Sequence, residues 1–172
     1  MSLRLIQKNP DARFRHYGDA AGSMRHKLHL SPMTQEGKVS LLIAEDDPHI
    51  RYLIEAAAER TGCFAPIASF ANGEAAWHAL QSAAPGALPE FVVSDLSMPR
   101  MTGVDLIRAM KGDERTRGIP VAIVTSSDQA ADREDALSAG ASAFERKPHG
   151  LEALTQLLAN LRHNCCEAEV SH

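Results

Sequence analysis

Short apolar runs alternate with helical patterns throughout residues 39–163, and this alternation restricts the chain to a small group of folds. Runs that are apolar at consecutive positions indicate strands covered on both faces. Strands that alternate with helices at this spacing form βαβ units with right-handed crossovers. We therefore predict an α/β fold: a doubly wound, parallel five-stranded sheet with five helices. The predicted strands are 39–44, 64–69, 91–94, 121–125 and 141–146.

The helical patterns carry recognisable start and stop signals. In the first pattern, apolar residues recur at positions 50, 53, 54 and 57, which form one face of a helix. Asp47 is its predicted N-cap and Gly62 its predicted end. Residues 126–128 are predicted to cap the fourth helix, and regularly spaced leucines predict a final helix over 151–163.

One predicted strand contains a proline, and this helps to order the sheet. Pro66 has no amide proton to donate to a neighbouring strand, so we expect the strand at 64–69 to lie at an edge. That placement suits the order 2-1-3-4-5 of the flavodoxin-like folds, whose ligands bind beyond the carboxyl ends of the strands. In this order the first, third, fourth and fifth strands end side by side.

Carboxylates, a hydroxyl and an ammonium follow those four strand ends. Several carboxylates at one rim repel one another, so a cation is needed to keep them all ionised. A hard divalent ion such as Mg²⁺ prefers carboxylate, water and phosphate oxygens, and a carboxylate nucleophile can form an aspartyl phosphate. We therefore predict a phosphoryl-accepting site with Asp95 as the acceptor. The site residues are Glu45, Asp46 and Asp47 after the first strand, Asp95 after the third, Thr125 ending the fourth and Lys147 after the fifth.

These residues resemble the receiver domain of response regulators, the phosphoacceptor module of two-component signalling. The resemblance covers residues 39–163. The matching positions are Glu45 and Asp46 (the acidic pair), Asp95 (the phosphorylated aspartate), Met98, Pro99 and Gly103 (the loop after it), Thr125 (the switch hydroxyl), Phe144 (the switch aromatic) and Lys147 with Pro148 (the lysine and its typically cis proline).

The resemblance implies a set of Mg²⁺ ligands. Asp46, Asp95 and the backbone carbonyl of Ser97 would coordinate the ion, and Glu45 would act through a water molecule. Asp47 is interpreted as a helix cap instead of a ligand. No other cofactor is implied.

The resemblance also implies a switch. Asp95 would accept a phosphoryl group from the phosphohistidine of a sensor kinase or histidine phosphotransfer protein. Thr125 would then move toward the phosphoryl group and Phe144 would turn inward, which would reshape the face of the fourth helix, fifth strand and fifth helix. Ser97 and Ser127 occupy positions where the family tunes the access of hydrolytic water.

Three other functions fit parts of the sequence. A flavodoxin-like electron carrier would need a Ser/Thr/Gly-rich phosphate loop after the first strand, where this chain has Glu-Asp-Asp-Pro. A phosphatase of the haloacid dehalogenase type needs a second Asp two residues after the nucleophile, where this chain has Ser97. The alternative that stays open is a receiver-fold interaction module that works without phosphorylation.

Charge divides the chain unevenly. Residues 1–38 hold seven Lys or Arg and three Asp or Glu, a net charge of +4, so residues 39–172 carry −8 for the chain to reach −4. An acidic main domain disfavours nucleic acid as a direct partner. We interpret 1–38 as a flexible basic extension, 39–163 as the receiver domain and 164–172 as a tail. His26 and His29 are interpreted as solvated loop histidines.

The remaining features predict a cytoplasmic signalling protein. Cys63, Cys165 and Cys166 have neither metal-finger nor CxxC spacing, which favours a reducing compartment. No stretch has the apolar length of a membrane span. Few residues follow the last helix, so we expect a stand-alone receiver that acts on a downstream protein and catalyses only its own phosphorylation and dephosphorylation. The sequence does not distinguish a monomer from a homodimer.

Overall fold

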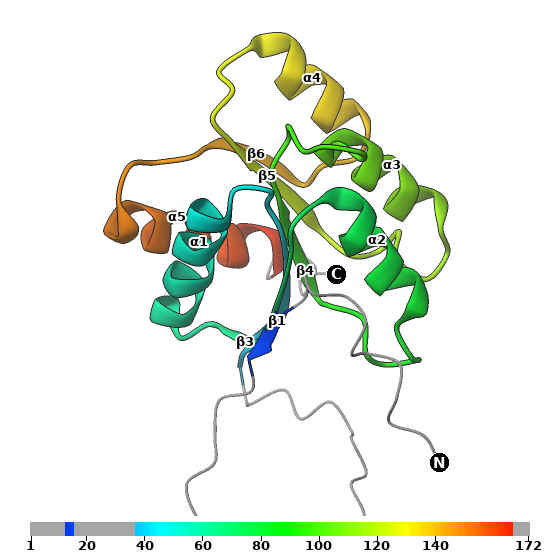
Figure 1. The fold of residues 1–172 in the computed structure, drawn as a ribbon, viewed down its shortest axis with the longest axis horizontal. Helices are drawn as coiled ribbons and strands as arrows, with labels where there is room; N and C mark the ends of the chain where they lie inside the picture. Colours follow the sequence, from blue (N-terminus) through cyan, green and yellow to red (C-terminus); the bar gives the residue numbers. More distant parts are fainter. Residues whose placement is uncertain (1–12, 16–36, 167–172) are drawn as a thin grey trace, which may run out of the picture.

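The computed structural model describes residues 13–15 and 37–166, which form one six-stranded sheet with five helices (Figure 1). The strand order is β1-β3-β2-β4-β5-β6. The elements are β1 (Arg13–Arg15), β2 (Val39–Ala44), α1 (Pro48–Thr61), β3 (Phe64–Phe70), α2 (Gly73–Ser82), β4 (Phe91–Ser94), α3 (Gly103–Gly112), β5 (Val121–Thr125), α4 (Ala130–Ser138), β6 (Ala143–Arg146) and α5 (Leu151–Cys166).

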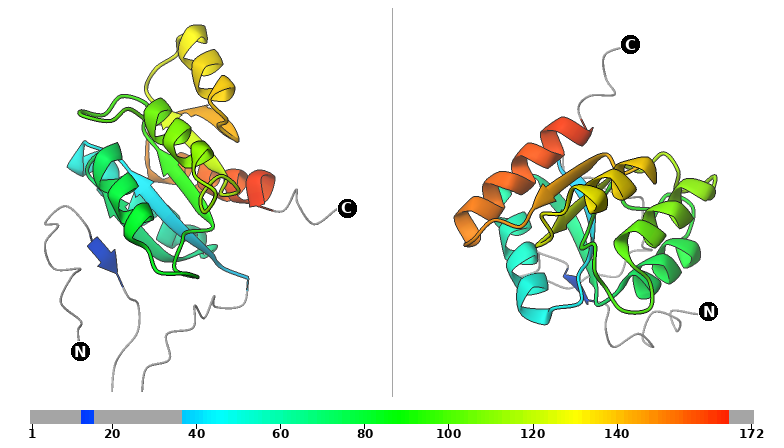
Figure 2. Two further views of the ribbon diagram at one scale, coloured as in Figure 1. Left: turned by 90° about the vertical axis from the view of Figure 1, so that its right-hand side faces the viewer. Right: turned by 90° about the horizontal axis from the view of Figure 1, so that it is seen from above.

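The helices form a layer on each face of the sheet, α1 and α5 on one side and α2, α3 and α4 on the other (Figures 1 and 2). Neighbouring residues of the central strands enter different cores. Ile43 and Val93 pack with α1 and α5, while Leu42 and Val92 pack with α2 and α3. Both faces are therefore buried, which explains why these strands are apolar at nearly every position, apart from Ser40 and Ser94.

The five predicted strands pair in parallel in the predicted order 2-1-3-4-5, as β3-β2-β4-β5-β6. The edge position predicted for the second strand is wrong, because β1 pairs antiparallel with the outer side of β3. Pro66 is tolerated for another reason. The β2–β3 register shifts between Val39 and Leu41, opposite Pro66, and the β1 pairing stops at Ile67. The missing amide proton thus falls at an irregularity of the β2–β3 ladder and beyond the end of the β1–β3 ladder.

Most helix ends follow the predicted signals. The Asp47 carboxylate accepts hydrogen bonds from the backbone of His49 and Ile50, and Gly62 ends α1 with φ 70°. The cap predicted for α4 at residues 126–128 is wrong. The N-cap is Gln129, which makes no side-chain capping bond, because the loop after β5 runs further before the helix begins.

The C-terminal helix is longer than predicted. α5 continues past His163 to Cys166, and Cys165 and Cys166 are partly buried against the α1–α5 core instead of exposed in a tail. Burial raises the pKa of the Cys165 thiol.

His26 and His29 lie outside the described residues. None of the helices in the described ranges has both the length and the apolarity to cross a membrane.

Candidate functional site

Four strand ends bring the predicted site residues to one edge of the sheet. The Asp95 backbone N–H donates to the Ala44 carbonyl at 2.8 Å, which fixes the end of β4 beside the end of β2. The Lys147 N–H donates to the Thr125 carbonyl at 2.7 Å, which does the same for β6 and β5. The parallel register therefore delivers the four side chains to one place, as the strand-end argument predicts.

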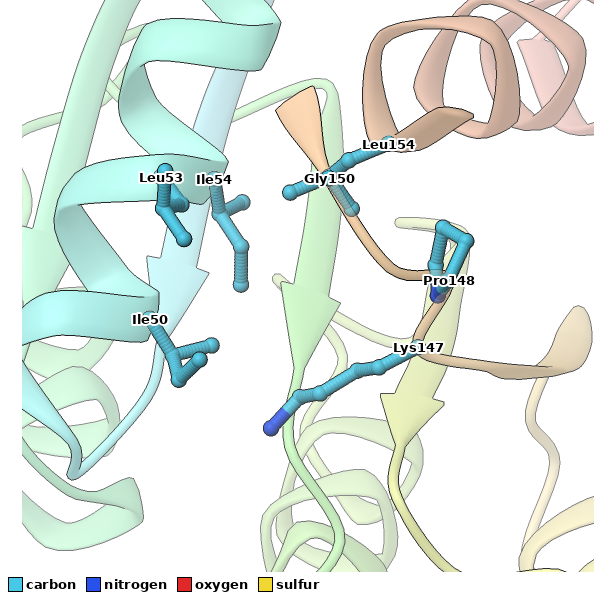
Figure 3. A pocket seen from close by; sticks show the side chains of 7 residues that line it. All are labelled: Ile50, Leu53, Ile54, Lys147, Pro148, Gly150 and Leu154. Carbon is cyan, nitrogen blue, oxygen red and sulfur yellow. The ribbon is translucent and has the colours of Figure 1, made fainter. Parts of the chain in front are cut away.

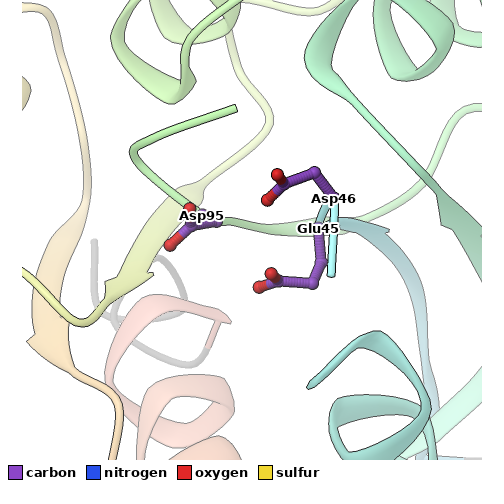
Figure 4. A group of neighbouring side chains, drawn as sticks. All are labelled: Glu45, Asp46 and Asp95. Carbon is purple, nitrogen blue, oxygen red and sulfur yellow. The ribbon is translucent and has the colours of Figure 1, made fainter. Parts of the chain in front are cut away.

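Three carboxylates converge at this edge (Figure 4). Oxygen atoms of Glu45, Asp46 and Asp95 all lie within 4.8 Å of one another. Glu45 and Asp95 are only 1% and 6% exposed, whereas Asp46 faces solvent. Three hard oxygen donors with one side open to water suit a divalent cation such as Mg²⁺, which keeps part of its hydration shell. The donor set therefore fits the predicted ion.

Lys147 holds two of these carboxylates together. Its ammonium lies 2.7 Å from Glu45 Oε2 and 2.8 Å from Asp95 Oδ1. Burial raises the pKa of the Glu45 carboxyl, and the nearby ammonium offsets only part of this effect. Burial alone would lower the pKa of Lys147, but its interactions with Asp95 and Glu45 outweigh burial and raise it. Lys147 is therefore a charged partner of both carboxylates.

The Asp95 side chain is held at its second oxygen as well. Its Oδ2 accepts a hydrogen bond from the Ser97 backbone N–H at 3.0 Å. Its backbone carbonyl accepts a bond from the Ser94 hydroxyl at 2.8 Å. Gly103 packs against the same carbonyl, because a Cβ atom there would lie 2.2 Å from the Asp95 oxygen. This close approach, more than the backbone freedom of glycine, requires Gly103.

Sequence reasoning missed one basic residue at the site. Arg51, on the first turns of α1, donates from Nη1 to the Glu45 backbone carbonyl at 2.7 Å. It adds a positive charge beside the acidic pair and ties the loop after β2 to α1. Its spacing from Glu45 is six residues, which carries no recognised sequence signal.

The two predicted switch residues lie on neighbouring strands. Thr125 is buried, and its hydroxyl accepts a hydrogen bond from the Ser127 N–H at 3.3 Å. Phe144 is 6% exposed and packs with the α2–α3–α4 core, so the structure shows its inward position only. The Thr125 movement and an inward turn of Phe144 stay predictions.

The peptide between Lys147 and Pro148 differs from the expected cis form. Among the described residues the cis peptide bond is Ala65–Pro66, so Lys147–Pro148 is trans. The trans form is the lower-energy isomer of an X–Pro bond, and Lys147 reaches both carboxylates from it.

Beside Lys147 lies an apolar pocket, with α1 residues on one side and the β6–α5 segment on the other (Figure 3). It is lined by Ile50, Leu53, Ile54, Lys147, Pro148, Gly150 and Leu154.

Comparison with known proteins identifies one family. The sequence-family model of the response regulator receiver domain matches residues 41–159 of this chain. Response regulator Rre1 from Synechocystis is 32% identical over 123 residues, which are 72% of this chain and 51% of Rre1. The chain thus spans about half the length of that relative. Chemotaxis protein CheY1 from Helicobacter pylori is 28% identical over 120 residues, 70% of this chain and 94% of CheY1.

Solved structures show the same fold. The phosphorylated cyanobacterial phytochrome response regulator RcpA superposes with a TM-score of 0.68 at 18% identity, covering 77% of this chain and 97% of RcpA. The Mn²⁺-bound form of response regulator Rcp1 gives a TM-score of 0.64 at 19% identity, covering 73% of this chain and 92% of Rcp1. At these identities the likeness establishes the fold.

Proposed function

Because the chain belongs to the response regulator receiver domain family, we propose that Asp95 accepts a phosphoryl group in two-component signalling. The observation that carries this proposal is the Lys147 ammonium, which contacts both Glu45 and Asp95 at the carboxyl edge of the sheet. A surface aspartate would need no such partner. A buried carboxylate with an ammonium on one oxygen and a backbone N–H on the other is oriented for chemistry.

The proposed transfer forms one bond and breaks one. A carboxylate oxygen of Asp95 attacks the phosphorus of a phosphohistidine, the P–N bond breaks, and the imidazole leaves with the electron pair and takes up a proton. The product is an acyl phosphate on Asp95. Attack by water later returns the carboxylate and releases inorganic phosphate. Lys147 and Thr125 offer an ammonium and a hydroxyl to the phosphoryl oxygens. Both donors position the phosphoryl group, and the ammonium also neutralises part of its negative charge.

We propose Mg²⁺ as the ion of the acidic cluster, held by Asp46, Asp95 and the Ser97 carbonyl, with Glu45 acting through water. When bound, a divalent ion neutralises charge on the phosphoryl oxygens. The three convergent carboxylates support this assignment, and response regulator Rcp1 has been crystallised in a Mn²⁺-bound form.

The proposed donors are a sensor histidine kinase or a histidine phosphotransfer protein, and the proposed output is a contact with a downstream protein through the face of α4, β6 and α5. The chain would act in the cytoplasm without a nucleic-acid contact of its own. Its only catalysis would be its own phosphorylation and dephosphorylation.

Incubation with acetyl phosphate and Mg²⁺, followed by intact-mass measurement, tests the central proposal. We expect the wild-type chain to gain one phosphoryl group and Asp95→Asn to gain none, because an amide is not a nucleophile for this reaction. Asp105→Asn, which makes the same change on the outer face of α3, is the matched control and should react like wild type. Equal labelling of Asp95→Asn, or no labelling of wild type, would contradict the proposal.

A further inference from the structure

Helix α4 has the least support from the core among the described helices. Ala136 is its one buried residue, whereas each of the other helices buries three or four. Its N-cap, Gln129, makes no side-chain capping bond. Segments with few buried apolar contacts open and shift most easily. Individual polar contacts should therefore decide where α4 lies.

One such contact connects the first turn of α4 with Thr125. The Ser127 hydroxyl donates a hydrogen bond to the Asp132 carboxylate and accepts one from the Gln129 N–H at 3.3 Å. The Ser127 backbone N–H donates to the Thr125 hydroxyl oxygen at 3.3 Å. Asp132 thus fixes Ser127, and Ser127 contacts the hydroxyl that is proposed to bind the phosphoryl group.

The next residue of α4 makes a second contact, with Phe144. Arg133 Nη1 donates to the Phe144 backbone carbonyl at 2.8 Å. The guanidinium carbon also lies 5.9 Å from the centre of the Phe144 ring, within the range of a cation–π interaction. Arg133 therefore holds α4 against β6, and does so at the position of the switch aromatic.

We propose that Asp132 and Arg133 are positioning residues, which hold α4 against the ends of β5 and β6 and thereby set how readily Thr125 moves toward a phosphoryl group on Asp95. This proposal rests on the proposed function of Asp95. The Thr125 oxygen now accepts the Ser127 N–H, and a move toward Asp95 stretches a bond that is already long. Loss of either α4 contact lowers the cost of that move.

The test measures the affinity for beryllium fluoride, a tetrahedral phosphoryl mimic, in the presence of Mg²⁺. We expect Asp132→Ala and Arg133→Ala to bind it about threefold to tenfold more tightly than wild type, the range set by one lost hydrogen bond. Asp132→Asn keeps an acceptor and Arg133→Lys keeps a donor, so both should return toward the wild-type value. The titration is followed by NMR at the Ser127 and Lys147 amides.

Two controls separate this role from a general loss of stability. Glu134→Ala and Arg146→Ala remove the same charges from exposed positions on α4 and β6 and should leave the affinity unchanged. Amide hydrogen exchange of α4, measured without beryllium fluoride, should accelerate in Asp132→Ala and Arg133→Ala only. Unchanged exchange, or affinities equal to those of the controls, would overturn the positioning role. A wild-type chain that binds no beryllium fluoride would instead overturn the proposed function.

Discussion

Lys147 favours the ionised form of the buried carboxylate in the acidic cluster. Glu45 is almost fully buried, and an unpaired buried carboxylate would take up a proton. The ammonium offsets part of that effect, and its own pKa is raised by the two carboxylates. Asp46, in contrast, faces solvent. The cluster therefore combines a buried carboxylate with a permanent partner and an exposed one that is free to meet an incoming cation.

Gly103, the first residue of α3, offers a test of how closely this helix must pack against the backbone of Asp95. A Cβ atom would lie 2.2 Å from the Asp95 carbonyl oxygen and 3.0 Å from Ile123 Cδ1. We expect Gly103→Ala to destabilise the fold by about 1–3 kcal/mol, as overpacking does, and to slow labelling by acetyl phosphate because the Asp95 backbone must move. Urea unfolding and intact-mass kinetics measure the two effects.

Gly112 is the matched control, since it lies at the other end of α3. A Cβ atom there meets nothing within 4 Å. Gly112→Ala should be neutral or stabilise the fold by up to about 1 kcal/mol, with labelling unchanged. Equal effects of the two substitutions would show that the close approach at Asp95 does not constrain position 103.

At the level of elements, α3 carries a capping box that makes its stability depend on pH. Thr102 and Asp105 bond each other's backbone N–H groups, and the Thr102 hydroxyl donates to the Asp105 carboxylate at 2.7 Å. This hydrogen bond is the main reason why the pKa of Asp105 is lowered. A lowered pKa in the folded state stabilises the fold above the unfolded pKa of about 3.9, and this stabilisation is lost as pH falls through the folded pKa.

We therefore expect wild type to be more stable than Asp105→Asn at pH 7, by about 0.5 kcal/mol because the carboxylate is exposed and screened. The difference should shrink as pH falls below about 4. Urea unfolding of both chains between pH 7 and pH 2.5 measures it, and taking the difference removes the titration of all other carboxylates. A difference that stays constant over this range would contradict the assignment.

Element by element, the sequence predicts what depends on local pattern. Asp47 and Gly62 mark the ends of α1, because caps act on the adjacent backbone. The start of α4 is not predicted, because Ser127 bonds Asp132 across the loop instead of capping the helix directly. The strand ends place Asp95 and Lys147 together, since parallel pairing fixes their neighbours.

Contacts between elements are harder to predict. Arg51 and Arg133 each donate to a backbone carbonyl outside their own helix, and nothing in their spacing marks either residue. Their partners become adjacent only after the sheet and helices have packed. β1 is missed for a similar reason, because three residues in a polar segment carry no usable period and pair only through the tertiary fold.

For the whole molecule, β1 changes which strand forms the edge of the sheet. The site draws on β2, β4, β5 and β6, whereas β1 contacts the outer side of β3. Deletion of residues 1–36 should therefore leave labelling by acetyl phosphate intact. It should lower the free energy of unfolding by about 1–3 kcal/mol, from the lost β1–β3 hydrogen bonds. It should also promote self-association, because an exposed strand edge pairs with other chains.

Phe14→Pro in the 172-residue chain separates strand pairing from the other effects of the deletion. Phe14 pairs with Ala68, and a proline in a three-residue strand removes an amide donor and disfavours the pairing without changing the charge. Sedimentation velocity at several concentrations should show self-association of both the deletion and Phe14→Pro chains but not of wild type. If only the deletion associates, another part of residues 1–36, and not the β1 pairing, opposes self-association. If neither associates, β1 does not protect the β3 edge.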